Sequence, residues 1–123
     1  MVKGIGVDII EIERIRRDIE SLGSPFLEKV FTPLEIAYCT GKQNKHQHFA
    51  ARFAAKEAVS KALSTGWAGE FRWKDVEVMN DASGQPRVTL AGKLRERLAD
   101  DGILITLSHS QHYVVAVALI EGS

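Results

Sequence analysis

The sequence predicts an α+β fold in which a largely antiparallel sheet packs against one long helix. Three features predict it: an apolar segment typical of a strand at the N-terminus, a long helical segment that begins near residue 46, and alternating apolar residues through most of the second half. A chain of 123 residues is long enough to bury one core. We therefore expect a single domain over residues 1–123, with a strand and helices followed by the sheet.

The N-terminal segment predicts a strand followed by a helix. Residues 2–10 are mostly apolar, and the glycines Gly4 and Gly6 indicate that another backbone or a ligand approaches closely there. Residues 11–22 have the spacing of an amphipathic helix that ends at Gly23. The apolar stripe of this helix consists of Ile12, Ile15, Ile19 and Leu22.

Two short helices and one long helix are predicted next. Ser-Pro at 24–25 and Thr-Pro at 32–33 each combine a capping residue with proline at the first helical position. Glu35 lies three residues after the threonine, as in a capping box. The long helix is expected from about residue 46 to 64, with Gly66 as its stop signal.

The second half changes to the period of strands. The turn residues at 81–84 connect two alternating segments, and Gln111 and His112 connect the last two strands as a hairpin. The resulting sheet is expected to pack against the long helix, with one helix inserted between its strands. The elements that we expect are strands at 73–80, 86–90, 103–110 and 113–121 and a short helix at 91–101.

Composition restricts the classes of function. The formal net charge is zero, so no overall field attracts nucleic acid or a membrane surface. The longest apolar run, residues 113–120, is far below the roughly 20 residues that cross a bilayer. The N-terminus reaches charged residues at once, and no signal peptide is visible. Cys39 is the single cysteine, which excludes an internal disulfide and fits the cytoplasm; we expect a half-buried structural thiol.

Glu57 and Lys61 interrupt the apolar pattern of the long helix one turn apart. An unpaired charge among apolar residues is costly to desolvate, so this position needs an explanation. The simplest explanation is a surface ion pair, because glutamate precedes lysine by four residues in the favourable order. The alternative is a division of labour in which the carboxylate holds a metal and the ammonium holds a phosphate.

Asp8 is a second acid in an apolar segment. If Val7 points into the core, Asp8 lies on the opposite face of the strand, toward the long helix or solvent. Its simplest role is to cap the helix that begins near Glu11.

The segment Ser108-His109-Ser110 ends an apolar strand. Neighbouring strand residues point to opposite faces, so His109 does not act as a base for an adjacent serine, and a hydrolase triad is not indicated. Hydroxyl and imidazole donors at a strand end suit a phosphate or a ribose better.

The phosphate-binding loops that sequence motifs usually reveal are absent. Neither GxxxxGK[ST] nor GxGxxG occurs, and His46 and His48 are two residues apart, which places them on different helix faces and argues against a zinc pair. What remains is two carboxylates and a group of cations that includes Arg52 and Lys56. Such oxygen ligands suit Mg²⁺, which takes one or two carboxylates, waters and the phosphates of a substrate.

Four segments in this order resemble the holo-[acyl-carrier-protein] synthases, the small bacterial phosphopantetheinyl transferases. The Phe-x-x-Lys-Glu-Ala-x-x-Lys-Ala element at residues 53–62 is highly specific, and the resemblance extends over nearly the whole chain. The other segments are Gly6-Val7-Asp8, Gly84-Gln85-Pro86 and Ser108-His109-Ser110.

The resemblance implies a reaction and a set of catalytic residues. The 4′-phosphopantetheine arm of coenzyme A would pass to a serine of apo acyl carrier protein for fatty acid biosynthesis, with release of adenosine 3′,5′-bisphosphate. Asp8 and Glu57 would hold Mg²⁺, and Lys61 would offset charge on the phosphates. A metal-bound water or Glu57 would take the serine proton, with Glu35 as a weaker candidate. The residues implied to bind coenzyme A are Arg52, Lys61, Gly84, Pro86, His109 and Ser110.

The resemblance also implies partners and an assembly. Members of this family are homotrimers with the active site between neighbouring subunits, and terminal apolar strands leave a sheet edge that needs covering. Arg14 and Arg17 lie three residues apart on the predicted solvent side of the first helix, where they would meet the acidic carrier protein. In this family that helix is usually densely basic, whereas here four acids dilute its arginines: Glu11, Glu13, Asp18 and Glu20.

Two other functions are compatible with these residues. The first is a binding module for a carrier protein or a nucleotide that keeps this fold without catalysis, for which loss of Asp8, Glu57 or Lys61 would be the signature. All three residues are present. The second is an unrelated Mg²⁺-dependent phosphotransferase with a nucleoside triphosphate as donor.

Overall fold

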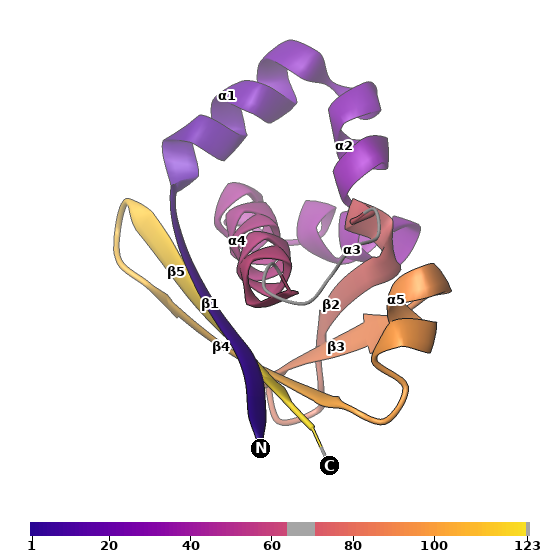
Figure 1. Cartoon of the computed structure of the whole chain (residues 1–123). Helices are drawn as coiled ribbons and strands as arrows, with labels where there is room; N and C mark the ends of the chain where they lie inside the picture. Colours follow the sequence, from indigo (N-terminus) through magenta and orange to yellow (C-terminus); the bar gives the residue numbers. More distant parts are fainter. Residues whose placement is uncertain (64–70, 123) are drawn as a thin grey trace.

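A computed structural model describes residues 1–63 and 71–122. It shows an antiparallel sheet, a long central helix and a set of shorter helices that surround the far side of that helix (Figure 1). The helices are α1 (Ile12–Leu22), α2 (Ser24–Val30), α3 (Pro33–Thr40), α4 (Lys45–Leu63), the short 3₁₀ helix η1 (Trp73–Asp75) and α5 (Gly92–Arg97). The strands are β1 (Val2–Glu11), β2 (Val76–Asn80), β3 (Pro86–Leu90), β4 (Gly102–His109) and β5 (Tyr113–Glu121).

The predicted α+β class is confirmed, and the strands are divided between two sheets. In the larger sheet β5 lies between β1 and β4, and both pairings are antiparallel. The hairpin of β2 and β3 forms a second antiparallel sheet on the other side of α4 (Figure 1). The expectation of one continuous sheet is therefore wrong, because the edges of β3 and β4 approach each other without pairing. The predicted end of the long helix, at Ser64 and Gly66, lies outside the described residues.

The two glycines of β1 allow this strand to lie directly on α4. A Cβ atom on Gly4 would overlap the carbonyl oxygen of Ala62, and one on Gly6 would overlap that of Ala58. The predicted close approach is confirmed, and the neighbour is the backbone of α4. Contact at this distance requires a residue without a side chain.

The same contact determines which way Asp8 faces. Gly6 and Ile10 are buried against α4, and Asp8 lies between them on the same face of β1. Val7 points outward and is 54% exposed, so it does not enter the core. Asp8 therefore lies on the helix side of the sheet.

A buried ion pair connects α4 to the second sheet and the short helices. Lys56 and Glu35 are both 0% exposed, and the Lys56 ammonium donates to Glu35 Oε1 at 2.7 Å. Lys56 also donates to the carbonyls of Val30 and Trp73, at 2.9 and 3.1 Å. Because all three ammonium protons have acceptors, the cost of burying this charge is compensated.

Glu35 carries out two structural tasks from the first turn of α3. Its side chain accepts from the Thr32 backbone N–H at 2.8 Å, which completes the predicted capping box. Its second oxygen accepts from the Val78 N–H at 2.7 Å and so attaches α3 to β2. Cys39, further along α3, is fully buried rather than half-buried, and burial raises the pKa of its thiol to about 11. No helix in the described part of the chain is long and apolar enough to cross a membrane.

Candidate active site

Asp8, Glu57 and Lys61 come together where β1 lies on α4. The Lys61 ammonium donates to Asp8 Oδ1 at 3.0 Å and to the Val7 carbonyl at 3.1 Å. The Asp8 side chain is 14% exposed and that of Lys61 is 53% exposed, so the group lies at the surface. Asp8 is not a helix cap, because Glu11 occupies the N-cap position of α1 without a side-chain cap.

The two carboxylates of this group repel each other. The pKa of Glu57 is raised above its ordinary value, first by partial burial and second by the negative charge of Asp8. Lys61 and Arg14 oppose these effects without cancelling them. A bound cation would relieve the repulsion and stabilise both ionised carboxylates.

The donor set fits Mg²⁺ better than a metal that needs many protein ligands. Within residues 1–63 and 71–122, no group of three or more His, Cys, Asp or Glu side chains is placed to hold a metal ion. Mg²⁺ commonly takes one or two carboxylates and completes its shell with waters and substrate phosphates. Asp8 and Glu57 would be those two carboxylates.

A second group of predicted residues lines a hollow of about 270 Å³ beside the first half of α4. Arg52 is 1% exposed, and its guanidinium donates to Asn80 Oδ1 at 2.9 Å and to the His48 carbonyl at 3.4 Å. Its Nε has no hydrogen-bond partner among residues 1–63 and 71–122. None of the described residues that line the hollow is acidic: Gln47, His48, Ala51, Arg52, Asn80, Gly84, Pro86, Leu107, Ser108, His109 and Val114.

A buried guanidinium without a carboxylate is an unusual and costly arrangement. Arg52 forms no ion pair with any of the residues that the structure describes. Its guanidinium lies over the Tyr38 ring, with 4.5 Å between the Cζ atom and the ring centre. The hollow therefore presents positive charge that an anion from outside would neutralise. Phosphate is the anion best matched to guanidinium geometry.

The turn between β2 and β3 brings Gly84 and Pro86 to this hollow. Asp81 Oδ1 accepts from the Ser83 hydroxyl at 2.6 Å and from the Gln85 N–H at 3.1 Å, and these bonds lower the pKa of Asp81 to about 2. Gly84 has a φ of 88°, which a residue with a side chain rarely adopts. Asn80 joins the turn to α4, since its amide donates to the Gly84 carbonyl at 2.9 Å while its oxygen holds Arg52.

Two residues of the segment Ser108-His109-Ser110, the serine at 108 and the histidine, line this hollow. His109 shares the inward parity of Leu107 and lines the hollow opposite Arg52. Ser110 begins the turn instead, where its hydroxyl accepts from the Tyr113 N–H at 3.3 Å. The structure thus brings Arg52, Gly84, Pro86 and His109 together and leaves Ser110 outside this hollow.

The two groups lie on different faces of α4. Arg52 and Lys61 are nine residues apart, and at 3.6 residues per turn this spacing places them about half a turn apart around the helix axis. One chain therefore presents the carboxylates and the acid-free hollow on opposite sides of the same helix. A single donor molecule would have to reach around α4 to contact both groups of one chain.

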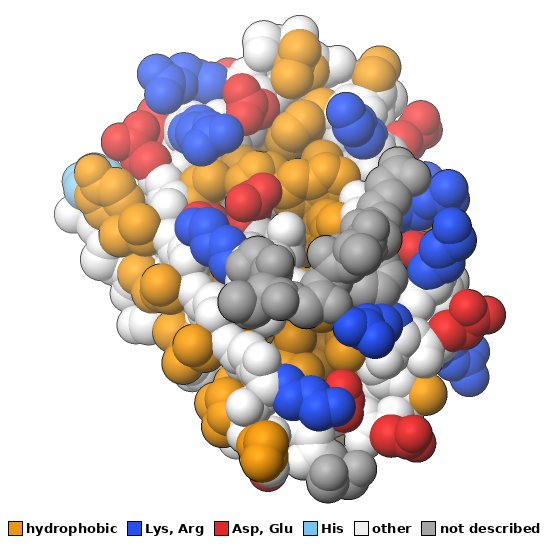
Figure 2. Space-filling model, viewed as in Figure 1, with side chains coloured by type: hydrophobic (Ala, Val, Ile, Leu, Met, Phe, Trp, Pro, Cys, Tyr) orange, Lys and Arg blue, Asp and Glu red, His pale blue; other side chains and the backbone are white. Residues whose placement is uncertain are grey.

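The predicted docking residues lie on α1, near the carboxylate group. Arg14 approaches Asp18 at 4.0 Å and lies 5.9 Å from the centre of the Phe53 ring, and Arg17 approaches Glu11 at 3.7 Å. On the face shown in Figure 2, apolar side chains gather between α1 and α2, and charged side chains of both signs border them. Phe53 stacks on Trp73 with 5.1 Å between ring centres.

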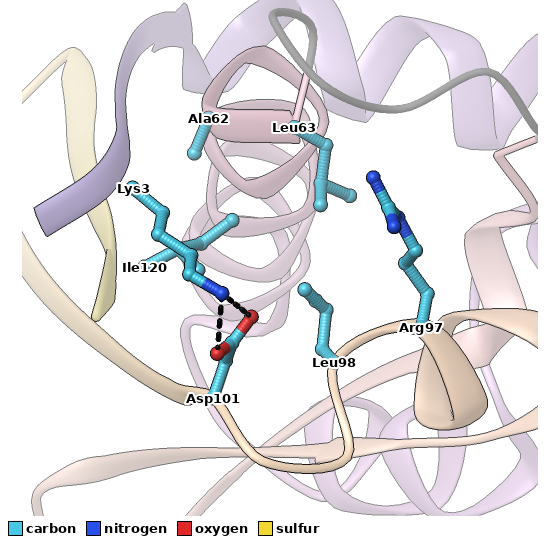
Figure 3. A pocket seen from close by; sticks show the side chains of 7 residues that line it. All are labelled: Lys3, Ala62, Leu63, Arg97, Leu98, Asp101 and Ile120. Atoms are coloured by element: carbon cyan, nitrogen blue, oxygen red, sulfur yellow. Dashed lines mark hydrogen bonds and ion pairs between the residues drawn. The ribbon is translucent and has the colours of Figure 1, made fainter. Parts of the chain in front are cut away.

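Another hollow, of about 140 Å³, lies at the C-terminal end of α4 (Figure 3). Lys3 and Asp101 form an ion pair of 3.1 Å across it, which connects the start of β1 to the start of β4. Ala62, Leu63, Leu98 and Ile120 give it apolar walls. No residue predicted to be functional lines it, and we assign it no part in the site.

Sequence reasoning missed two residues of the acid-free hollow. Asn80 orients Arg52, and the only signal was its position at the end of a strand, before a turn. His48 was considered only as a member of a zinc pair with His46. Its spacing of four residues before Arg52 is the signal that places both on one face of α4.

The chain is similar to known proteins over nearly its whole length. Residues 4–118 match the model of the 4′-phosphopantetheinyl transferase superfamily. A holo-[acyl-carrier-protein] synthase of Protochlamydia amoebophila is 48% identical over 119 residues, which cover 97% of this chain and 98% of the relative. That of Geotalea daltonii is 44% identical over 124 residues, with 98% and 99% covered.

Solved structures give the same result. A holo-[acyl-carrier-protein] synthase from Neisseria meningitidis superimposes with a TM-score of 0.87 at 30% identity and covers 98% of this chain and 99% of its own. One from Bacillus anthracis, in complex with coenzyme A (3′,5′-ADP), gives 0.83 at 34% identity over 100% and 99%. The chain therefore belongs to the holo-[acyl-carrier-protein] synthases of the 4′-phosphopantetheinyl transferase superfamily.

Proposed function

We propose that this chain transfers 4′-phosphopantetheine from coenzyme A to a serine of apo acyl carrier protein for fatty acid biosynthesis. The observation that carries the proposal is the charge pattern of α4, with two mutually repelling carboxylates on one face and an acid-free hollow with a buried guanidinium on another. The first suits a metal ion and the second a phosphate. The single cysteine, Cys39, is buried and forms no disulfide, which fits a reducing compartment such as the cytoplasm.

The donor has phosphates for both places. Coenzyme A carries a diphosphate, at which transfer occurs, and a separate 3′-phosphate on its ribose. Asp8, Glu57 and Lys61 provide metal ligands and a cation for the diphosphate, so the remaining cationic hollow, with Arg52 and His109, is left for the 3′-phosphate. Gly84 and Pro86 would contact the nucleoside from the rim, and Ser110 would reach the donor only from the hairpin turn.

The residues of the carboxylate group divide the chemistry between them. The serine oxygen forms a bond to the phosphorus that carries pantetheine, while the bond from this phosphorus to the leaving adenosine 3′,5′-bisphosphate breaks. Asp8 and Glu57 would hold Mg²⁺, which would supply Lewis-acid stabilisation of the diphosphate. Lys61, held by Asp8 and the Val7 carbonyl, points its ammonium toward this region and offsets the charge that develops on the leaving phosphate.

The serine proton has two possible acceptors. Glu57 has a raised pKa, which suits a proton acceptor, and a water in the metal shell is the alternative. Glu35 is not a candidate, because it is 0% exposed and both of its oxygens accept hydrogen bonds from inside the protein.

A trimer would bring the two groups together. Since one chain holds them on opposite sides of α4, we propose that the carboxylates of one subunit and the hollow of its neighbour form one active site. The outer face of the larger sheet supplies an apolar surface for this contact, visible along the left edge of Figure 2. Its exposed apolar residues include Ile5, Val7, Ile9 and Leu104.

The carrier protein would dock on α1, beside the carboxylate group. The positive charge of Arg14 lowers the pKa of Glu57, which supports a place for α1 beside the proposed reaction centre. Arg14 and Arg17 would meet acidic side chains near the target serine, and the apolar region at Phe53 and Trp73 would exclude water from the contact.

Intact-mass analysis of the carrier protein tests the function. Apo carrier incubated with the enzyme, coenzyme A and Mg²⁺ should gain the mass of one phosphopantetheine, and excess chelator should prevent the gain. A binding module without catalysis would leave the mass unchanged, and an unrelated phosphotransferase would require a nucleoside triphosphate instead.

Mixed subunits test the shared site. Trimers of Glu57→Gln alone and of Arg52→Ala alone should both be nearly inactive. After the two variants are unfolded together and refolded, some interfaces combine an intact carboxylate group with an intact hollow, so activity should return. If the mixture stays as inactive as its components, each site lies within one subunit.

A further inference from the structure

The acid-free hollow contains a titratable group that the proposed reaction does not use. His48 lies four residues before Arg52 on α4, so both side chains belong to the face of the helix that borders the hollow. His109 reaches the same space from β4. Two imidazoles and one guanidinium therefore line the hollow, and none of the described residues that line it is acidic.

We propose that His48 is a third ligand for the ribose 3′-phosphate of coenzyme A and that it takes up a proton from solvent when this phosphate binds, so that affinity for the donor rises as pH falls. This inference rests on the proposed function. It makes His48 a determinant of selectivity for coenzyme A over the same molecule without its 3′-phosphate.

The surroundings of His48 keep it neutral while the hollow is empty of anions. Its ring contacts the Tyr38 ring edge to face, with 5.7 Å between centres. The pKa of His48 is lowered first by partial burial, then by Arg52 of the same helix, by Lys42 after α3 and by His109 of β4. The groups that act on the charge of His48 are therefore all basic side chains.

A phosphate in the hollow would reverse this balance. A phosphate monoester carries close to two negative charges at neutral pH, and an opposite charge in hydrogen-bond range favours the protonated imidazole. The proton then converts a neutral hydrogen bond into a charge-assisted one. Protonation and phosphate binding are linked, so each promotes the other.

His46 is the matched control for this role. It belongs to the same helix two residues earlier and does not line the hollow. The pKa of His46 is also lowered, first by burial, but the charges that act on it come from Lys45 and from α1 through Glu20, Arg16 and Glu13. Replacing it changes a histidine of similar exposure that faces a different part of the molecule.

The experiment is isothermal titration calorimetry of the assembled enzyme with adenosine 3′,5′-bisphosphate. Titrations at pH 7 in two buffers with different ionisation enthalpies give the number of protons taken up. Wild type and His46→Asn should take up more protons than His48→Asn. The loss of affinity in His48→Asn should be about tenfold at pH 6, the effect of one charge-assisted hydrogen bond. At pH 8.5 the affinities of His48→Asn and wild type for the bisphosphate should be nearly equal.

Dephospho-coenzyme A, which lacks the 3′-phosphate, is the second ligand, and its affinity should be the same for wild type and His48→Asn. Equal proton uptake by the two proteins, or a loss of affinity that does not change with pH, would overturn the inference. Failure of the proposed function gives a different result, since wild type would then neither bind the bisphosphate nor modify the carrier. His48→Gln, with thermal unfolding of each variant, separates these outcomes from a folding defect.

Discussion

Two acid–base groups on α4 use the same residue types for different purposes. Lys56 and Glu57 are consecutive, yet Lys56 points into the core and Glu57 points toward β1. The Lys56–Glu35 pair is completely buried, and its hydrogen bonds all end within the protein. The group of Asp8, Glu57 and Lys61 lies at the surface, and its two carboxylates repel each other.

The two groups differ in whether the protein itself provides a partner for every charge. The cost of burying the pair is offset because each charge has its partners, and loss of one partner would leave the other charge buried alone. The surface group keeps an unfavourable interaction that the protein alone does not relieve, a property common at functional sites. Variants of the first group should therefore change stability, and variants of the second should change activity.

The largest effect is expected from the carboxylates of the surface group. Asp8→Asn and Glu57→Gln each remove charge from the proposed metal site, so kcat/KM for carrier modification should fall by about 10³-fold or more. Asp100→Asn changes an exposed acid outside this group and should leave the rate unchanged. Near-normal turnover of either variant in steady-state kinetics would mean that the ligand assignment is wrong.

Glu57→Gln should also make the metal-free protein more stable. Since the folded-state pKa of Glu57 is raised, the folded protein binds more protons than the unfolded chain between the ordinary and the raised value. Stability is therefore lost as pH rises through this window, and the ionised carboxylate is a cost at neutral pH. The variant should unfold at a higher temperature than wild type at pH 7, and the difference should shrink at pH 4.

The buried pair should show the reverse behaviour. Lys56→Met leaves the Glu35 carboxylate buried without its cation and should reduce the free energy of unfolding by about 3–5 kcal/mol. Chemical denaturation measures this loss. The double variant with Glu35→Gln should be less destabilised than the sum of the two single variants, because the remaining charge is removed. Additive losses would show that the two side chains do not act as a pair.

Lys61→Ala should reduce activity with little change in stability. Its ion pair with Asp8 is half-exposed, and such pairs contribute under about 1 kcal/mol to folding. The loss of a cation from the reaction centre should reduce kcat/KM by about 10²-fold. Kinetics and thermal unfolding measured on the same preparation distinguish the two roles, and matched losses would assign Lys61 to the fold.

The smallest effect is expected on α1. Reversal of Arg14 and Arg17 to glutamate should weaken carrier use about tenfold and leave the affinity for coenzyme A unchanged, since charges at the rim of a contact act mainly on association. Wild-type efficiency should fall gently with salt, because Asp18 and Glu11 already approach these two arginines. If the carrier KM and the salt response do not change, the carrier docks elsewhere.

The sequence predicted the local structure well. The capping box of Thr32 and Glu35, the last hairpin and the close approach at Gly4 and Gly6 were predicted from patterns within a few residues, and the structure confirms them. The side of β1 on which Asp8 lies could also have been predicted from the sequence. It shares the parity of the two glycines, and these mark the face that meets the helix.

Contacts between distant residues were not predictable in this way. Glu35 and Lys56 are 21 residues apart and Asp8 and Lys61 are 53 apart, so no helix or strand period connects them. The favoured partner of Lys61 by spacing was Glu57, whereas its ammonium donates to Asp8. The capping box gave Glu35 a sufficient role, which concealed its ion pair. The residues implied by the resemblance to a family remain predictions that the variants above test.

The most direct measurement is the effect of Mg²⁺ on thermal unfolding with saturating coenzyme A. Wild type, Glu57→Gln and Asp100→Asn would be compared with and without the metal. The carboxylates of the surface group should bind the ion, so Mg²⁺ should raise the unfolding temperature of wild type and Asp100→Asn and leave that of Glu57→Gln nearly unchanged. An equal rise in all three proteins would contradict the assignment of Glu57 to the metal site.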